Sequence, residues 1–219
     1  MRKWKWALAG LGAVAMGSAV AYAQYSDTEE PAHEVLKSED LFELRDYAPM
    51  IVAEVTVTGD RRSARGQGFR RLAAYIFAQD RPDGGEKIAM TAPVMQDRPA
   101  QDEQIAMTAP VMADSPEAGV WRTRFVMPGK YTLDTLPTAP EDITLTTVPG
   151  RRMAVITFSG NAPQRDLELA ESQLRAWIAA QELEITGGVE HAFYDAPMVP
   201  GRFRRNEVMI PVSAEVSAE

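Results

Sequence analysis

The sequence Ile-Ala-Met-Thr-Ala-Pro-Val-Met occurs twice in this chain, at residues 88–95 and again at residues 105–112. The residues between the two copies, 96–104, include acidic side chains and a proline, which is typical of a loop. Each octamer has the length of one β-strand. The repeat therefore predicts either the two arms of a hairpin or a tandem duplication of one strand with its turn.

Both octamers carry methionine, whose thioether is a ligand for copper(I). Met90 and Met95 fall on opposite faces of an extended strand because side chains alternate, and Met107 and Met112 do the same. This spacing favours core strands whose methionines fill irregular gaps over a copper site. Pro93 has no N–H to donate, so the strand should be an edge strand or be bulged there.

N-terminal to the octamers the sequence predicts strands followed by a helix. Alternating residues 41–47 and the β-branched run 50–58 predict two strands of one hairpin, joined by a turn at Ala48-Pro49. Residues 62–79 change to a helical period, and we expect their apolar stripe to be Phe69, Leu72, Ala73 and Ile76.

C-terminal to the octamers a similar order of elements follows. We expect strands at 121–127, 143–148 and 153–158, then a helix with Asn161 as its N-cap, then strands around 191–194 and 208–212. The buried stripe of this helix should be Leu167, Ala170, Leu174, Trp177 and Ile178. The chain is therefore expected to be an α+β fold of two similar halves, in which each helix covers one face of a shared antiparallel sheet.

The N-terminal residues have the composition of a secretory signal peptide. A basic start is followed by the apolar run Trp6 to Val20 and by Ala21-Tyr22-Ala23, a small-x-small cleavage pattern. We expect cleavage near Ala23, a periplasmic or secreted product, and no stable membrane insertion afterwards. The remaining chain is divided into a flexible lead-in at 24–33, one domain at 34–212 and a tail at 213–219.

Composition excludes several classes of function. Removing Arg2, Lys3 and Lys5 with the signal peptide changes the net charge from −8 to −11, which argues against a nucleic-acid partner. The chain contains no cysteine, so it has neither disulfides nor thiolate metal sites. An anionic ligand would have to be met by a local basic cluster within an acidic protein.

Several separated motifs resemble those of the SOUL heme-binding family. They are Phe42 to Pro49 in the opening strand, Phe69 to Leu72 with Tyr75-Ile76 in the first helix, Lys87 to Val94, Phe125 to Pro128, Phe158 to Gly160 and Arg204 to Val208. The resemblance covers residues 34–212. It implies a twisted antiparallel, barrel-like β-sheet of two pseudo-symmetric halves flanked by two α-helices.

The resemblance also implies reversible binding of heme or a related porphyrin. Where some family members have a histidine proposed as the axial iron ligand, this sequence has Asp46. His191 is the remaining candidate axial ligand, because His33 lies in the lead-in. Other members are described as holding heme on an apolar surface flanked by basic residues, and that mode fits this sequence better.

Arginines cluster in two places that border the cleft implied by the resemblance. One group (Arg61, Arg62, Arg65, Arg70 and Arg71) lies on or before the first helix, and the other (Arg202, Arg204 and Arg205) lies in the last loop beside Met198, Val199, Pro200 and Phe203. Guanidinium groups suit carboxylates such as propionates. The expected binding residues are Gln67, Arg70, Arg71, Ala74, Met198, Phe203, Arg204 and Arg205.

The sequence thus favours a non-catalytic, exported tetrapyrrole-binding protein for heme trafficking, storage or buffering. Two alternatives stay open. One is an enzyme that releases iron from a tetrapyrrole or modifies it, although no nucleophile–base pair or metal cage is evident. The other is a sensor or interaction module for another apolar ligand.

Overall fold

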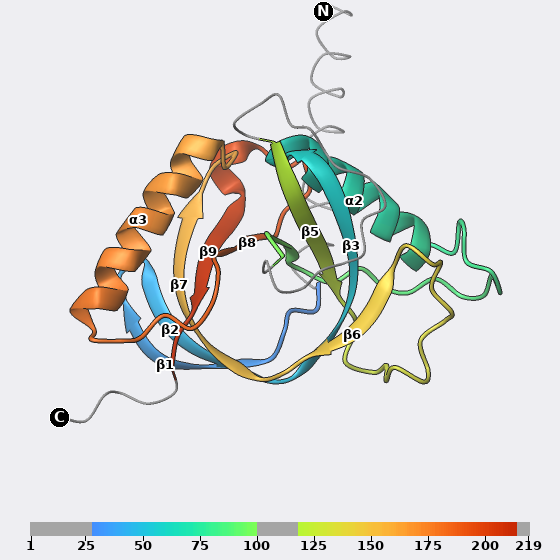
Figure 1. The fold of residues 1–219 in the computed structure, drawn as a ribbon, viewed down its shortest axis with the longest axis horizontal. Helices are drawn as coiled ribbons and strands as arrows, with labels where there is room; N and C mark the ends of the chain where they lie inside the picture. The colour runs from blue at the N-terminus through green and yellow to red at the C-terminus, as the bar shows by residue number, and fades with distance from the viewer. Residues whose placement is uncertain (1–27, 100–117, 214–219) are drawn as a thin grey trace, which may run out of the picture.

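The computed structural model describes residues 28–99 and 118–213, which form one antiparallel sheet of nine strands with two α-helices (Figure 1). The strands are β1 (His33–Glu39), β2 (Phe42–Tyr47), β3 (Met50–Asp60), β4 (Val94–Asp97), β5 (Ala118–Val126), β6 (Thr144–Val148), β7 (Arg151–Ser159), β8 (Glu190–Phe193) and β9 (Arg205–Pro211). The helices are α2 (Arg61–Ile76) and α3 (Gln164–Ala180), and the 3-10 helix η1 (Gly201–Phe203) precedes β9. The expected α+β class is confirmed, with a twisted sheet that curves but does not close.

The strand order is β1-β2-β7-β9-β8-β4-β5-β3-β6. The expected hairpin between residues 41–47 and 50–58 is wrong, because β2 pairs with β1 and β7 while β3 pairs with β5 and β6. Alternation along a strand reports which face is buried and does not specify the partner strand.

A long two-stranded ribbon links the two halves instead. Tyr47 pairs with Arg151 and Met50 pairs with Val148, so one register continues from β2–β7 into β3–β6 across the bend. A Cβ on Gly150 would lie 3.0 Å from the carbonyl oxygen of Tyr47, which explains why the bend uses glycine. Figure 1 shows this ribbon curving beneath both halves.

Each helix packs on the outer face of one half. Helix α3 buries the expected stripe, Leu167, Ala170, Leu174, Trp177 and Ile178, against β7 and β9. The N-cap expected at Asn161 is wrong: α3 begins after Pro163, with no side-chain cap. Helix α2 is capped by Asp60, whose carboxylate accepts the Ser63 N–H at 3.0 Å.

The first octamer is not one strand, because only Val94 and Met95 of it belong to β4. The N–H of Ile88 donates to the carbonyl of Ile76 at 2.8 Å, and that of Ala92 donates to the carbonyl of Glu29 at 3.0 Å. These two backbone N–H groups therefore donate to the end of α2 and to the lead-in, and not to a neighbouring β-strand. The core position expected for Met95 is confirmed, since its exposure is 4%. The second octamer lies outside the described residues.

The lead-in expected to be flexible over residues 24–33 makes defined contacts in its described part. The Glu29 carboxylate accepts the Gly129 N–H at 2.6 Å, the Glu30 carboxylate pairs with Arg205, and β1 begins at His33. No helix in the described ranges is long and apolar enough to cross a membrane.

Candidate functional site

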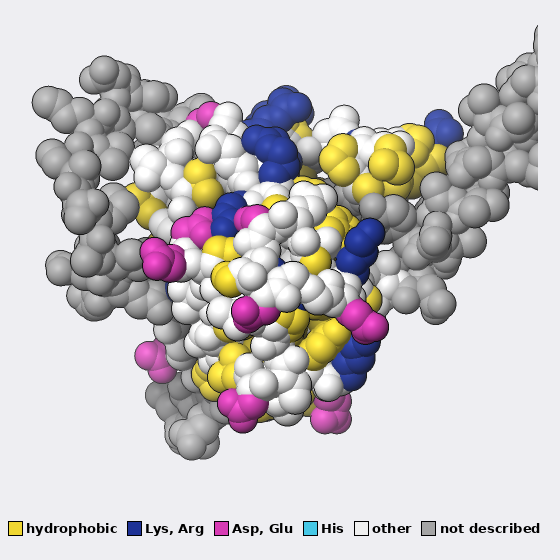
Figure 2. Space-filling model, turned by 90° about the vertical axis from the view of Figure 1, so that its right-hand side faces the viewer, with side chains coloured by type: hydrophobic (Ala, Val, Ile, Leu, Met, Phe, Trp, Pro, Cys, Tyr) yellow, Lys and Arg dark blue, Asp and Glu magenta, His cyan; other side chains and the backbone are white. Residues whose placement is uncertain are grey.

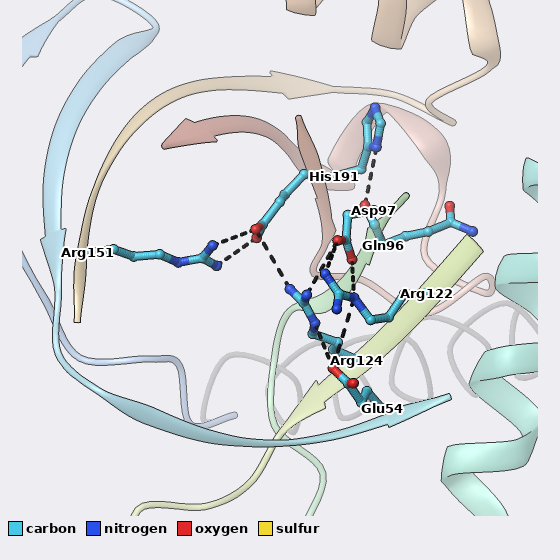
Figure 3. Close-up of polar contacts among 8 residues, drawn as sticks. Glu54, Gln96, Asp97, Arg122, Arg124, Arg151 and His191 are labelled. Carbon is cyan, nitrogen blue, oxygen red and sulfur yellow. Dashed lines mark hydrogen bonds and ion pairs between the residues drawn. The ribbon is translucent and has the colours of Figure 1, made fainter. Parts of the chain in front are cut away.

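Two groups of arginines with different surroundings are the strongest candidates for chemistry. The first group lies on the inner, concave face of the sheet. Arg122 and Arg124 of β5 reach Asp97 and Glu54, with nitrogen–oxygen distances of 2.7 Å for Arg122–Asp97 and 3.2 Å for Arg124–Glu54. Arg151, from the other half, makes hydrogen bonds of 2.6 and 2.8 Å to Glu190 (Figure 3).

A second buried ion pair on the same inner face is centred on Glu207. Its two carboxylate oxygens each accept from Arg45 at 3.1 Å, and the Tyr194 hydroxyl donates to it at 2.6 Å. Glu207 is only 1% exposed. Tyr47, which accepts a hydrogen bond from Arg45, has its pKa raised to about 12, chiefly by burial.

Every arginine of the inner face described above thus meets at least one carboxylate. Such pairs are costly to break, because removing one partner leaves a buried charge without compensation. They account for arginines at buried strand positions without requiring a ligand. Among the described residues, no group of three or more His, Cys, Asp or Glu side chains is arranged to hold a metal ion.

The second group lies at the outer face, where α2 begins beside β8. The guanidinium of Arg65 lies 4.0 Å from the centroid of the Phe193 ring, in cation–π geometry. Burial, followed by the charges of Arg62 and Arg204, lowers the pKa of Arg65. The helix arginines and the last-loop arginines expected from sequence therefore do come within electrostatic range, through Arg65 and Arg204.

Arg61 contributes a buried donor to this group. Its Nη1 atom is buried and has no hydrogen-bond partner among the described residues. Burial and then the charge of Arg65 lower its pKa to about 10, opposed by the charge of Glu168. A buried guanidinium donor without a partner is costly, but nitrogens of Arg81, Arg151 and Arg205 share this feature, so Arg61 is a candidate because it also lies beside Arg65.

His191 lies under the same cluster and is 6% exposed. Its Nδ1 lies 3.3 Å from the backbone oxygen of Gln96. Burial, then the nearby charge of Arg61, lowers its pKa to about 4, so the imidazole is neutral at pH 7. A ring so buried is not presented at the surface as an axial ligand.

The binding residues expected on α2 differ from one another in exposure and in their partners. Arg71 is held by ion pairs to Asp80 and Asp142, whereas Arg70 and Gln67 are exposed. Ala74 is half-buried. The Asp142 hydrogen bond raises the pKa of Arg71. Since the charge of Arg71 is already matched, we consider Arg61 and Arg65 the better candidates for binding an anion.

The binding residues expected in the last loop also differ in their partners and in their exposure. Arg205 pairs with Glu30, and its guanidinium lies 3.4 Å from the centroid of the Tyr194 ring. Arg204 donates to the backbone oxygen of Val199 at 2.7 Å and so fixes the loop. Met198 and Phe203 are exposed by 74% and 55%, which leaves an apolar surface beside these arginines.

Asp46, at the position of the proposed axial ligand, pairs with Arg152 through two hydrogen bonds of 2.8 Å. The His33 ring contacts the Tyr47 ring, with 4.9 Å between the ring centroids and a tilt of 37° between the planes. On the side carrying the loops after α2 and β5, acidic and basic side chains are interspersed, with no continuous basic surface (Figure 2).

Sequence reasoning included Arg61 and Arg65 among the helix arginines but omitted them from the binding residues. Their spacing of four residues places both on one helix face, and this signal was available. Phe193 was missed as a site residue, because its contact with Arg65 joins segments far apart in the chain.

Comparisons with known proteins agree with this architecture. The family model described as SOUL heme-binding protein matches residues 28–102 and 95–211. No curated protein sequence matches the chain. Among solved structures, the EcmrR C-terminal domain is similar with a TM-score of 0.55 and 14% identity, covering 78% of this chain and 96% of that one. A hydrolase from Listeria innocua is similar with a TM-score of 0.53 and 12% identity, covering 81% and 94%. At these identities the likeness shows the fold alone.

Proposed function

The chain belongs to the SOUL heme-binding protein family, and on this basis we propose that it binds heme or a related porphyrin reversibly at the α2–β8 arginine cluster. The cluster is defined as Arg61, Arg62, Arg65 and Arg204. The observation that supports this location is the buried, unpartnered Nη1 of Arg61 beside Arg65.

The chemistry of a porphyrin matches this surface. A heme is a flat apolar plate with propionates at one edge, so its binding site needs an apolar surface bordered by cationic groups. Phe193, Met198 and Phe203 are the apolar side chains near the cluster, and the last two are exposed by 74% and 55%. Guanidinium groups donate charge-assisted hydrogen bonds to carboxylates.

The proposed role is binding without catalysis, in trafficking, storage or buffering of the tetrapyrrole. His191, beneath the cluster, is buried and its pKa is about 4, so it is a weak base. Neither nucleic acid nor a membrane is part of the proposal.

Export is part of the same proposal and rests on the N-terminal sequence alone. We expect the mature chain to begin at Gln24 and to be recovered from the periplasm or the medium. Determination of the N-terminal residue of the protein purified from its own cells tests this. A chain that retains residues 1–23 contradicts it.

The direct test is a hemin titration of the purified protein, followed by the shift of the Soret band. We expect saturable binding at micromolar hemin, and we expect Arg65→Glu to weaken it at least tenfold, because one charge-assisted hydrogen bond is worth about 1.5–3 kcal/mol. The matched control is Arg175→Glu on α3, which makes the same change in net charge at an exposed site paired with Glu171.

Two outcomes would overturn the proposal. The first is the absence of a saturable Soret shift, and the second is equal weakening by Arg65→Glu and Arg175→Glu. Release of iron or formation of metal-free porphyrin during incubation with heme and a reductant would instead establish the enzyme alternative.

A further inference from the structure

The loop between β8 and β9 presents apolar side chains to solvent. Residues 196–204 read Ala-Pro-Met-Val-Pro-Gly-Arg-Phe-Arg and contain no acidic residue. Met198 is exposed by 74% and Phe203 by 55%, whereas Val199 between them is buried and packs the loop against the fold. Single exposed hydrophobic residues are common on protein surfaces, so the surroundings of these two side chains decide whether they matter.

The loop is held in one shape by its own hydrogen bonds. The N–H of Val199 donates to the carbonyl of Ala196 at 3.0 Å. The Arg204 guanidinium donates to the backbone oxygen of Val199 at 2.7 Å and to that of Pro197. Met198 lies between these two acceptors in the chain, so its exposed side chain projects from a defined turn. A loop ordered in this way loses little further conformational freedom when it docks, which favours binding through a few side chains.

Arginines lie next to these apolar side chains. The Arg202 guanidinium is 4.6 Å from the centroid of the Phe203 ring, so charge and apolar surface are adjacent within the loop itself. The charges of Arg204 and Arg62 both act on Arg65 of α2. Arg202 and Arg62 are exposed. The loop and the start of α2 therefore form one basic region that contains exposed apolar side chains.

A nearby acid and the net charge of the protein oppose this local positive charge. Glu168 of α3 lies within electrostatic range of Arg61. The chain carries a net charge of −8, so most of its surface repels an anionic partner. At physiological salt, screening limits exposed charges to a range of about 8 Å, so the local arginines dominate at contact distance. The acidic remainder of the protein then allows an anionic surface to be approached in one orientation only.

We propose that this region docks the protein reversibly on an anionic lipid bilayer. Met198 and Phe203 enter the headgroup layer, while Arg202 and Arg62 contact lipid phosphates. Protruding apolar side chains beside arginines suit a fluid surface into which they can sink, whereas a protein partner would need pockets to receive them. Docking does not depend on the proposed porphyrin binding, although Met198 and Phe203 are common to both.

The test is co-sedimentation of the purified protein, without porphyrin, with vesicles of phosphatidylcholine mixed with phosphatidylglycerol and with vesicles of phosphatidylcholine alone. We expect binding to the mixed vesicles that weakens as salt is raised, and much weaker binding to phosphatidylcholine. Arg202→Glu should weaken binding to the mixed vesicles by about tenfold, because it replaces attraction to the lipid phosphates with repulsion. Phe203→Ser should weaken it by about fivefold, because the ring no longer leaves water. Both side chains are exposed, so neither substitution removes a core contact.

Two matched controls should bind the mixed vesicles as the parent protein does. Arg175→Glu makes the same change in charge on α3, and Leu133→Ser removes an apolar side chain that is exposed by 43% between β5 and β6. Absence of binding to the mixed vesicles overturns the proposal and leaves an acidic protein as the partner that the charge would fit. Equal binding to both kinds of vesicle overturns it, and so does equal binding by the parent protein and the Arg202 and Phe203 variants, which would place the contact elsewhere in the chain. Because no porphyrin is present, this test and the hemin titration can fail independently.

Discussion

The inner face of the sheet contains buried arginines and the outer α2–β8 cluster contains half-buried ones, but carboxylates that hydrogen-bond to them are described only on the inner face. Glu207 holds Arg45 through two hydrogen bonds of 3.1 Å, whereas Nη1 of Arg61 has no described partner. A buried arginine is therefore not by itself a sign of function. The presence or absence of a bonded carboxylate separates the arginines that hold the sheet together from those that we propose bind an anion.

The largest effect should come from removing a carboxylate that pairs with a buried arginine on the inner face. Glu207→Gln should destabilise the protein by about 3–5 kcal/mol, because it leaves the Arg45 charge buried without a counter-charge. The free energy of unfolding from a urea titration measures this. A loss below about 1 kcal/mol would mean that the inner network contributes little to the fold.

The next effect concerns the histidine beneath the uncompensated cluster. The pKa of His191 is about 4 in the folded protein, below the usual value of 6.5 for a histidine side chain. The unfolded chain then binds the proton first, so stability is full above pH 6.5 and is lost as the pH falls toward 4. The loss should approach about 3 kcal/mol.

Unfolding free energies measured between pH 7 and pH 4 check this prediction. His191→Gln should remove that part of the pH dependence while other carboxylates keep theirs. An unchanged pH profile in the variant would show that protonation of His191 does not contribute to the pH dependence of stability.

The smallest effect is expected where a charge pair is exposed. Arg175 and Glu171 lie four residues apart on α3, with a nitrogen–oxygen distance of 2.8 Å. Arg175→Ala should change the unfolding free energy by no more than about 0.5 kcal/mol, because water and salt screen such pairs. A larger loss would show that pairing matters at the surface as much as on the inner face.

Sequence periodicity predicted the features that depend on neighbouring residues, such as the buried face of a helix, but not the pairing of distant strands. The buried stripe of α3 matched residue by residue, because helical periodicity alone determines which side faces the sheet. The pairing of β2 with β7 was not predictable in this way, since the partner is more than a hundred residues away. The octamer failed as one strand because the donors at Ile88 and Ala92 are used by α2 and the lead-in.

The candidate site was predictable as a region and not residue by residue. The sequence grouped the arginines of the first helix and the last loop, and these groups do approach through Arg65 and Arg204. It selected Arg71, which Asp142 neutralises from a remote loop. Which arginine meets an acid depends on tertiary contacts, and no spacing rule along the helix contains that information.

The most direct measurement is thermal and urea unfolding of Arg61→Met with and without hemin. If Arg61 serves a ligand, removing its uncompensated charge should raise the unfolding free energy of the free protein by about 1 kcal/mol, because burial of that charge no longer opposes folding. The same variant should gain less stability from hemin than the parent protein, because its affinity is lower. A variant that is less stable without hemin, and is stabilised by hemin as much as the parent protein, would contradict the assignment of this cluster to ligand binding.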